Sequence, residues 1–504
     1  MEDIKELINI INKRKLSQIE VFDKSLISRK DTLFSKLYNN IANENIRTDL
    51  QAMVLLYGNE KDNSKYRKLK SRFKTRLLNT LYFLDINNNS STNLAKKEYA
   101  DCLNKLYLSN LLLRYAENRN ISIKLILDNY QIAKKNNFYD ILKEFSFKLL
   151  VHYGMTGNEK AYEAEKKAYD TYVLEYENEQ AAQIIYSKIY LLSHSLKKNQ
   201  SEKLQEIEIE LKKYEAILKK SNSLLVFFFL IRSNLFYFET KRDNKKINLI
   251  CDKFIAEYNQ YQSSLFKYEY LNNVYLYKLK SLFDSRQYTE TLQLANQMST
   301  ESKFGLNLLS MNEYILKTYL NLKETEKAKI FIHEVLHSSA YKHTTKLVKE
   351  RWLLFDAYVY FIYSYAKNEP FKFSTAKLYN QIPNLVQDKF GLNLSIRIIE
   401  ILFLIGKNDL DEAITKIENL ASYQNRYFKE SIYHRSNLFI KLLQIMEKKS
   451  FNYKSLKYLK EHTLLKENFD NQIINDNEII FFDQLWEIIL DVIERNDRKL
   501  LGRF

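Results

Sequence analysis

The amino-acid sequence predicts an all-α fold, an α-solenoid of stacked antiparallel helical hairpins. Only 7 glycines and 2 prolines occur in 504 residues, whereas these two residues together make up about twelve percent of an ordinary domain. Sheet folds need them at turns, bulges and phosphate loops, because only glycine adopts positive φ at little cost. Hydrophobic residues make up 45% of the chain, which is enough for a large core. These observations argue against barrels, sandwiches and dinucleotide-binding sheets, and they favour long helices.

Residues 1–115 are predicted to form a helical N-terminal domain or cap. Helical periodicity of apolar residues occurs over residues 25–41, 49–57 and 65–84. An Asn- and Ser-rich break follows at residues 87–92, where we expect a loop because such residues favour turns over helix interiors.

Residues 116–445 contain a repeated pattern of polar turns and apolar helical stripes, predicted to form about eight hairpins. The intervals between the turns average about 41 residues, the length of a two-helix unit. In the last unit, apolar residues from Ile396 to Ile405 share one helix face, and those from Leu410 to Ala421 share another. Neither stripe can be buried within a single helix, so the hairpins must stack. The turns are Asn118–Asn120, Gly157–Asn158, Lys198–Asn199, Arg242–Asp243, Ser285–Arg286, Leu322–Lys323, Lys367–Asn368 and Lys407–Asn408.

Residues 446–504 are predicted to cap the open end of the solenoid. A polar stretch covers residues 466–477, and an amphipathic helix follows it. Trp486 lies beside the apolar stripe of that helix, which consists of Phe481, Phe482, Leu485, Ile488, Ile489 and Val492.

Several turns resemble those of the tetratricopeptide-repeat family. This family places a small or polar residue at the turn, an apolar residue two positions later and a small residue three positions after that. Asn408, Leu410 and Ala413 follow this pattern, and Ile414 continues it. A partial match consists of Arg286, Tyr288, Thr291 and Leu292, and another contains Ala328 but departs from the pattern at Thr325. The resemblance covers about residues 116–445 and implies a curved solenoid whose inner face binds proteins or peptides.

The leading functional hypothesis is therefore a non-enzymatic adaptor or scaffold that holds a protein or peptide in its concave face. The chain contains 38 tyrosines, and rigid aromatic rings are favoured where a partner is bound. Candidate contact residues lie in two Tyr-rich helices and are Tyr268, Tyr275, Tyr358 and Tyr365. A net charge of +16 favours an acidic partner.

A basic helix gives the first alternative, a nucleic-acid-associated protein. Between Lys61 and Arg76 there are eight basic residues and one acidic residue, Asp62. Leu69, Phe73 and Leu77 form a narrow stripe for burial, so that basic side chains cover the rest of the helix and could reach phosphates. The basic patch comprises Lys65, Arg67, Lys68, Lys70, Arg72, Lys74 and Arg76. The other interpretation is a solvated basic face, or one that pairs with acidic helices of the same chain.

The second alternative is a zinc-dependent hydrolase. His333 and His337 form an H-E-x-x-H motif around Glu334, and His343 follows at the spacing of a third ligand. Two histidines four residues apart share one helix face, where they could bind zinc while Glu334 acts as the base. On a continuous helix, however, His343 would lie about 15 Å from His333 along the axis. Surface or structural histidines are therefore the competing interpretation.

The remaining signals predict no enzyme, no cofactor and no membrane span. With so few glycines, the sequence contains no dinucleotide fingerprint, phosphate loop or nucleophile elbow. The longest apolar run, residues 224–231, is far shorter than the roughly twenty residues that span a bilayer. Cys102 and Cys251 are the only cysteines, as expected of a reducing compartment. Because the first residues are acidic and lack an apolar signal core, we expect a cytoplasmic protein.

Overall fold

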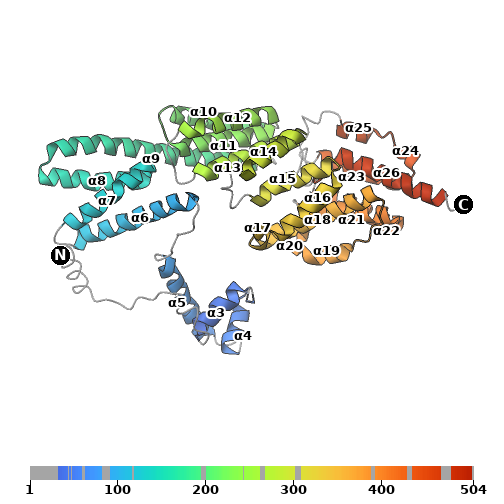
Figure 1. The fold of residues 1–504 in the computed structure, drawn as a ribbon, viewed down its shortest axis with the longest axis horizontal. Coiled ribbons are helices and arrows are strands. Elements are labelled where there is room, and N and C mark those ends of the chain that lie inside the picture. The colour runs from blue at the N-terminus through green and yellow to red at the C-terminus, as the bar shows by residue number, and fades with distance from the viewer. Residues whose placement is uncertain are drawn as a thin grey trace. The chain divides into compact units, whose positions relative to one another are not determined.

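A computed structural model of the protein describes residues 32–43, 45–46, 48–58, 63–81, 91–115, 119–194, 200–241, 243–260, 267–300, 308–387, 392–427, 434–466 and 478–501. In these ranges every regular element is helical, with 24 α-helices, one 3-10 turn and no strand (Figure 1). The predicted all-α fold is therefore confirmed. The chain forms two compact units, and the division between them falls after Tyr172, within helix α9 (Glu159–His194).

Helices α3 (Leu33–Ala42), α4 (Asp49–Tyr57) and α5 (Asn63–Leu81) share a small core and are called the N-terminal bundle here. Thr32 and Thr48 begin α3 and α4, since each side-chain hydroxyl accepts a hydrogen bond from a first-turn amide. The core of the bundle consists of Leu37, Ile46, Ala52, Met53, Tyr66, Leu69 and Phe73. The predicted stripe of α5 is thus buried at Leu69 and Phe73, with Leu77 packed at its edge.

The first unit continues with α6 (Ser91–Tyr115), α7 (Asn120–Lys135), α8 (Tyr139–Thr156) and the start of α9. Helix α6 packs against both α7 and α8. The predicted domain boundary after residue 115 therefore does not coincide with the division between the units, because α6 shares its apolar face with the hairpin that follows it.

Most of the second unit consists of helices that pack against their neighbours in sequence. Two large cores extend along it, one from Leu224 to Ile315 and one from Leu316 to Ile493. None of the described helices combines the length and the apolar character that crossing a bilayer requires. The helices are α10 (Gln200–Leu218), α11 (Leu224–Lys241), α12 (Asn244–Glu257), α13 (Lys267–Asp284), α14 (Tyr288–Thr300), α15 (Leu308–Asn321), α16 (Thr325–His337), α17 (Ser339–Lys342), α18 (Lys346–Lys367), α19 (Thr375–Gln381), α20 (Pro383–Gln387), α21 (Asn393–Lys407), α22 (Leu410–Tyr427), α23 (His434–Lys448), α24 (Tyr453–Leu456), α25 (Lys460–Lys466) and α26 (Phe482–Leu501).

Several of the predicted turns end their helices with the same backbone geometry, the Schellman motif. After α21, Asn408 has φ of 60° and donates its amide to the Ile405 carbonyl, while Asp409 donates to the Leu404 carbonyl. Gly58 ends α4 in this left-handed conformation, and among the described Schellman turns the left-handed residue is glycine at Gly157 and carries a side chain at the others. This geometry recurs at Asn137, Gly157, Arg286, Lys323, Asn368, Asn408 and Ser450.

Five of the predicted turns are confirmed as such helix ends, and Asn137 and Ser450 are two that the sequence analysis missed. Lys198–Asn199 and Arg242 lie outside the described residues. Asp243, next to the latter, is confirmed at a helix boundary, because its side chain caps α12.

The predicted apolar stripe of α26 is confirmed, since Phe482, Leu485 and Trp486 are each at most 1% exposed. Helix α26 packs against α21 and α23 as well as α24 and α25. This position buries the stripe against several helices, and it joins the segment after residue 445 to the body of the unit.

The start of α26 and the residues before it also reach the turns of earlier helices. Asn321, at the end of α15, accepts the Phe481 amide at 2.9 Å and donates to the Ile479 carbonyl. Further along α26, Arg495 donates to the Tyr365 carbonyl and Asn496 to the Ile405 carbonyl. We call residues 478–501 the C-terminal strap, because they follow the ends of α15, α18 and α21.

Candidate functional site

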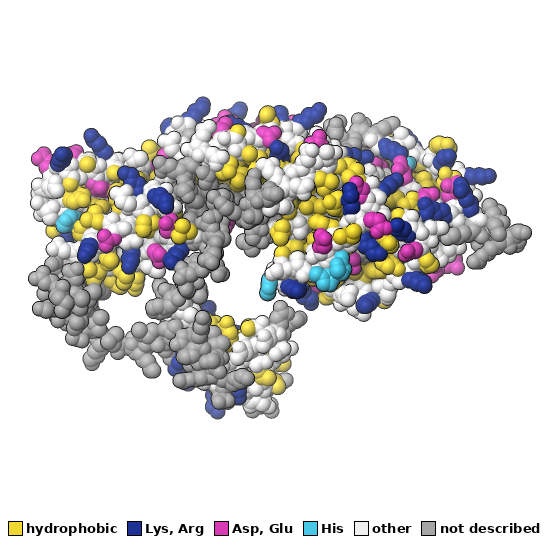
Figure 2. Space-filling view, in the orientation of Figure 1, with side chains coloured by type: hydrophobic (Ala, Val, Ile, Leu, Met, Phe, Trp, Pro, Cys, Tyr) yellow, Lys and Arg dark blue, Asp and Glu magenta, His cyan; other side chains and the backbone are white. Residues whose placement is uncertain are grey.

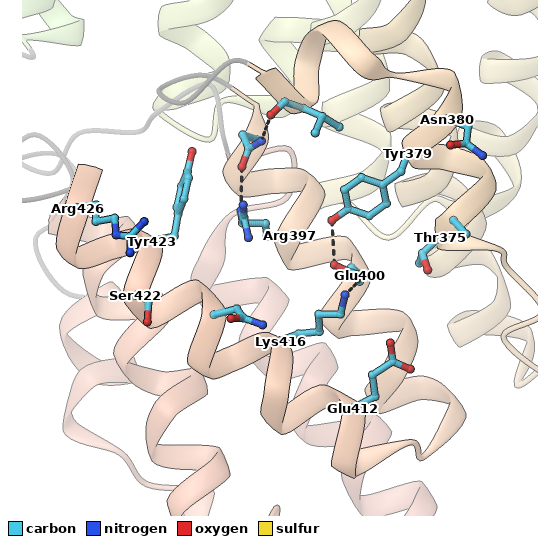
Figure 3. A pocket seen from close by; sticks show the side chains of 14 residues that line it. Thr375, Tyr379, Asn380, Arg397, Glu400, Glu412, Lys416, Ser422, Tyr423 and Arg426 are labelled. Atoms are coloured by element: carbon cyan, nitrogen blue, oxygen red, sulfur yellow. Dashed lines mark hydrogen bonds and ion pairs between the residues drawn. The ribbon is translucent and has the colours of Figure 1, made fainter.

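A cavity of about 1220 Å³ lies between α19, α20, α21 and α22 in the second unit (Figure 3). Two polar stripes, one on each long helix, line it. On α21 the stripe is Asn393, Arg397 and Glu400, spaced by four and three residues. The opposite stripe, on α22, consists of Glu412, Lys416, Asn419, Ser422, Tyr423 and Arg426.

At one end of the cavity, the charged side chains neutralise each other. Lys416 Nζ lies 2.8 Å from Glu400 Oε1, and the Tyr379 hydroxyl donates to Glu400 Oε2 at 2.8 Å. Burial raises the pKa of the Tyr379 hydroxyl, and the negative charge of Glu400 adds to this rise. Tyr379 therefore stays protonated and acts as a donor. This end of the cavity is held in one arrangement by its own side chains.

The other end of the cavity contains a cation stacked on an aromatic ring. The guanidinium carbon of Arg397 lies 4.4 Å from the centroid of the Tyr423 ring. Its Nε donates to Asn393 Oδ1 at 2.9 Å, and Asn393 in turn donates to the Val386 carbonyl. These contacts fix the plane of the guanidinium. Among the described residues no carboxylate forms an ion pair with Arg397, so its terminal nitrogens can bind a ligand.

Arg426 lies beside Tyr423 on the same stripe of α22 and is exposed (Figure 3). We call Arg397, Tyr423 and Arg426 the arginine subsite. Two guanidiniums and one ring can hold a carboxylate or phosphate by charge-assisted hydrogen bonds while the ring contacts an apolar group. The cavity also presents the amides of Asn380 and Asn419, which can pair with peptide groups.

The tyrosines predicted to bind a partner are not at this site. Tyr275 and Tyr358 are only 4% and 1% exposed, and the Tyr358 hydroxyl donates to the Ser395 carbonyl. Tyr365 donates to Asp491 of the C-terminal strap at 2.6 Å, and Arg495 stacks over its ring. Tyr275 and Tyr358 therefore pack within the unit, whereas Tyr365 is partly exposed and its contact with a partner stays a prediction. Tyr268 lies in the first turn of α13, among the residues whose side chains are not described.

The H-E-x-x-H motif lies in the last turns of α16. His333, Glu334 and His337 are exposed, and the two imidazole centroids are 4.1 Å apart. Figure 2 shows a group of histidine side chains on this surface. Ser338 ends the helix with an extended conformation, and His343 follows the short helix α17.

The end of α16 at Ser338 does not bring three ligands together into a metal site. Within the described ranges, no three His, Cys, Asp or Glu side chains converge to hold a metal ion. His343 is therefore not grouped with the His333–His337 pair in a metal-holding arrangement, and the zinc alternative gains no support from this geometry.

The predicted basic patch lies on α5, within the N-terminal bundle. Lys65, Arg67, Lys68, Arg72 and Lys74 are exposed. Lys70 is also exposed, but it pairs with Asp49 of α4 at 2.7 Å. Arg76 is only partly exposed, with its guanidinium carbon 4.3 Å from the Phe34 ring. The structure therefore places most of the predicted patch at the surface and gives Arg76 a packing contact.

Comparison of the chain with known protein families, with curated proteins and with solved structures found no match. The candidate site therefore rests on its own geometry. The sequence analysis missed it, although one signal was available. Arg397 and Glu400 interrupt an otherwise apolar helix at a spacing of three, and charged residues on such a face are buried only where they are paired or functional.

Proposed function

We propose that the protein is a non-enzymatic adaptor that binds an acidic peptide segment of a partner in the cavity between α19 and α22. The observation that carries this proposal is the arginine subsite. It presents two guanidiniums beside an aromatic ring at one end of an open cavity. At the other end, the charges of Lys416 and Glu400 already neutralise each other.

The size and lining of the cavity favour a peptide over a small metabolite. Its volume, about 1220 Å³, exceeds the roughly 300–1,000 Å³ of typical small-molecule sites. Asparagine amides and a tyrosine hydroxyl alternate along it with charged groups. Such groups can satisfy the donors and acceptors of a peptide backbone, while an aromatic ring supplies buried contact area.

We also propose that the helical hairpins stack as in tetratricopeptide repeats. The support for this stacking is the recurrence of short Schellman turns between consecutive packed helices, which is the local geometry that stacked helical hairpins require. We also place the protein in the cytoplasm, because both Cys102 and Cys251 are buried free thiols, as is usual in reducing compartments.

The test is a peptide-display selection on the immobilised full-length protein. We expect the enriched peptides to be rich in Asp and Glu, and a synthetic version to bind in solution. Replacing both guanidiniums, in the variant Arg397→Gln with Arg426→Gln, should weaken binding at least about tenfold, because a charge-assisted hydrogen bond contributes about 1.5–3 kcal/mol.

The matched control is Lys448→Gln, which removes one exposed cation at the end of α23, away from the cavity lining. This variant should bind the peptide as the unmodified protein does. The proposal fails if no acidic sequence is enriched, or if the double variant retains full affinity while the thermal unfolding midpoints of all three proteins agree.

A further inference from the structure

We propose that the arginine subsite binds the phosphate of a phosphorylated side chain, and that Glu412, at the far end of the same cavity, binds a basic side chain of the same peptide. This inference rests on the peptide binding proposed above and specifies the chemistry of the peptide. Three properties of the site support it, namely its charge, its hydrogen-bond donors and its length.

The arginine subsite carries two positive charges that the cavity does not neutralise. Neither Arg397 nor Arg426 forms an ion pair with a carboxylate among the described residues. Glu400, which follows Arg397 on the same stripe of α21, is already paired with Lys416 at 2.8 Å. A peptide carboxylate carries one negative charge, whereas a phosphate monoester carries about 1.5–2 at pH 7. A phosphate therefore matches the charge of both guanidiniums.

The donors of the subsite also suit a phosphate better than a carboxylate. Arg397 uses Nε for its hydrogen bond to Asn393 and packs on the Tyr423 ring, so that both terminal nitrogens can form a bidentate pair from a fixed plane. A carboxylate has only two oxygens, both of which this pair would engage. A phosphate has a third oxygen, which can accept from Arg426. The exposed side chain of Arg426 lies beside Tyr423 (Figure 3).

The opposite end of the cavity sets the length of the bound segment. Glu412 is exposed in the first turn of α22, forms no ion pair with any residue that the structure describes, and lies far from Arg426 in Figure 3. Along the helix axis Glu412 and Arg426 are about 21 Å apart. Because an extended chain covers about 3.3–3.6 Å per residue, about six residues of a peptide separate the two ends. A small phosphorylated metabolite cannot reach both.

The experiment presents the immobilised full-length protein with three synthetic peptide libraries. Each library has about seven degenerate positions on either side of a central residue, which is phosphoserine in the first library, Glu in the second and Ser in the third. We expect the phosphoserine library to be retained most strongly, with Lys or Arg enriched about six positions from the phosphoserine on one side.

A selected sequence is then made in all three forms, and its affinity is measured in solution by fluorescence anisotropy. The phosphoserine form should bind at least about tenfold more tightly than the Glu form, because phosphate adds both charge and a further charge-assisted hydrogen bond. Arg426→Gln, which changes an exposed side chain, should remove most of this preference. Arg397→Lys should do the same, since it keeps the charge but loses the planar fork.

Two further variants separate the ends of the cavity from the rest of the surface. Glu412→Gln should abolish the enrichment of Lys and Arg and leave the preference for phosphoserine unchanged. Lys448→Gln, away from the cavity lining, is the matched control and should keep both properties. Equal thermal unfolding midpoints would show that all of these variants remain folded.

Each contrary result has its own meaning. If the phosphoserine and Glu forms bind equally, the inference is overturned, while the proposed function stands provided that Arg397→Gln with Arg426→Gln still weakens both forms. The inference is also overturned if Arg426→Gln and Lys448→Gln lower the phosphoserine preference equally, or if Lys and Arg are not enriched at any position. If none of the three forms binds, the proposed function fails as well.

Discussion

The guanidinium of Arg286 lies 2.7 Å from the carboxylate of Asp483, although 197 residues separate them in sequence. Arg286 is the left-handed residue that ends α13, and Asp483 lies in the first turn of α26. The same carboxylate accepts a hydrogen bond from Arg435, whose guanidinium also binds Glu478 and the Leu465 carbonyl. The C-terminal strap is therefore anchored by a cluster of two arginines and two carboxylates, in which Arg286 is partly exposed and the other three side chains are buried.

Removing the central cation of this cluster should destabilise the second unit. Arg435 is fully buried, so Arg435→Met leaves Glu478 buried without its partner and Asp483 paired with Arg286 alone, at an expected loss of about 3–5 kcal/mol. Urea unfolding followed by the fluorescence of Trp352 and Trp486, both in this unit, measures the change.

The control for this prediction is Arg498→Met, which removes an exposed pair with Glu494 and should cost no more than about 1 kcal/mol. Similar midpoints for the two variants would contradict the role assigned to Arg435. Adding Glu478→Gln to Arg435→Met should recover part of the loss, since one buried charge is then removed.

Gly406 is required for close approach of two segments. A Cβ at this position would lie 2.5 Å from the Phe371 ring, so Gly406→Ala forces the ring to move and should cost about 1–3 kcal/mol. Gly154→Ala is the matched control in another helix, where the nearest atom is 3.5 Å away. Because alanine favours the helix by up to about 1 kcal/mol over glycine, this control should be neutral or stabilising. Differential scanning fluorimetry distinguishes the two, and a lower midpoint for the control alone would refute the argument.

Replacing a left-handed residue that carries a side chain by glycine should stabilise the protein. Lys323 has φ of 61° and is exposed, a conformation that costs a side-chain-bearing residue about 1–2 kcal/mol. Lys323→Gly should therefore raise the unfolding midpoint. Lys212→Gly, at an exposed position inside α10, should lower it, because glycine costs about 1 kcal/mol in a helix interior. Changes of the same sign in both variants would disprove the explanation.

The second unit should lose stability in mild acid through His462. Burial and the nearby charge of Lys466 lower the pKa of this imidazole, against the opposing effect of the Asp483 carbonyl, 3.3 Å from Nε2. The folded unit thus binds fewer protons than the unfolded chain. The contribution to stability is complete above the unfolded pKa, about 6.5, and is lost as pH falls from there towards the folded pKa.

Unfolding midpoints measured across this pH range should fall less in His462→Gln than in the unmodified protein. His333→Gln, on the exposed face of α16, is the control and should keep the original pH dependence. If both variants follow the unmodified protein, another group is responsible for the acid sensitivity.

The sequence predicted the features that depend on local chemistry. The helix ends at Arg286, Lys323 and Asn408 follow from polar residues between apolar stripes, and the burial of Leu485 and Trp486 follows from helical spacing. Both features depend on residues that are close together in the chain, so the local sequence pattern predicts them.

Features that depend on which helices meet could not be predicted in this way. Tyr275 and Tyr358 resemble contact residues in sequence, because tyrosine suits both a core and a binding surface. Their burial depends on neighbouring helices. The arginine subsite likewise requires that Arg397 of α21 faces Tyr423 of α22, and the sequence alone does not tell which faces of two helices meet.

The C-terminal strap also limits how this protein can change in evolution. Arrays of independent hairpins gain and lose units readily, since each unit contacts only its neighbours. Here Asn321, Tyr365 and Ile405, each at the end of a different helix, bind residues at fixed positions along the C-terminal strap. Inserting or deleting one hairpin between them would break this correspondence. The number of hairpins between α15 and α21 is therefore limited by the length of the strap.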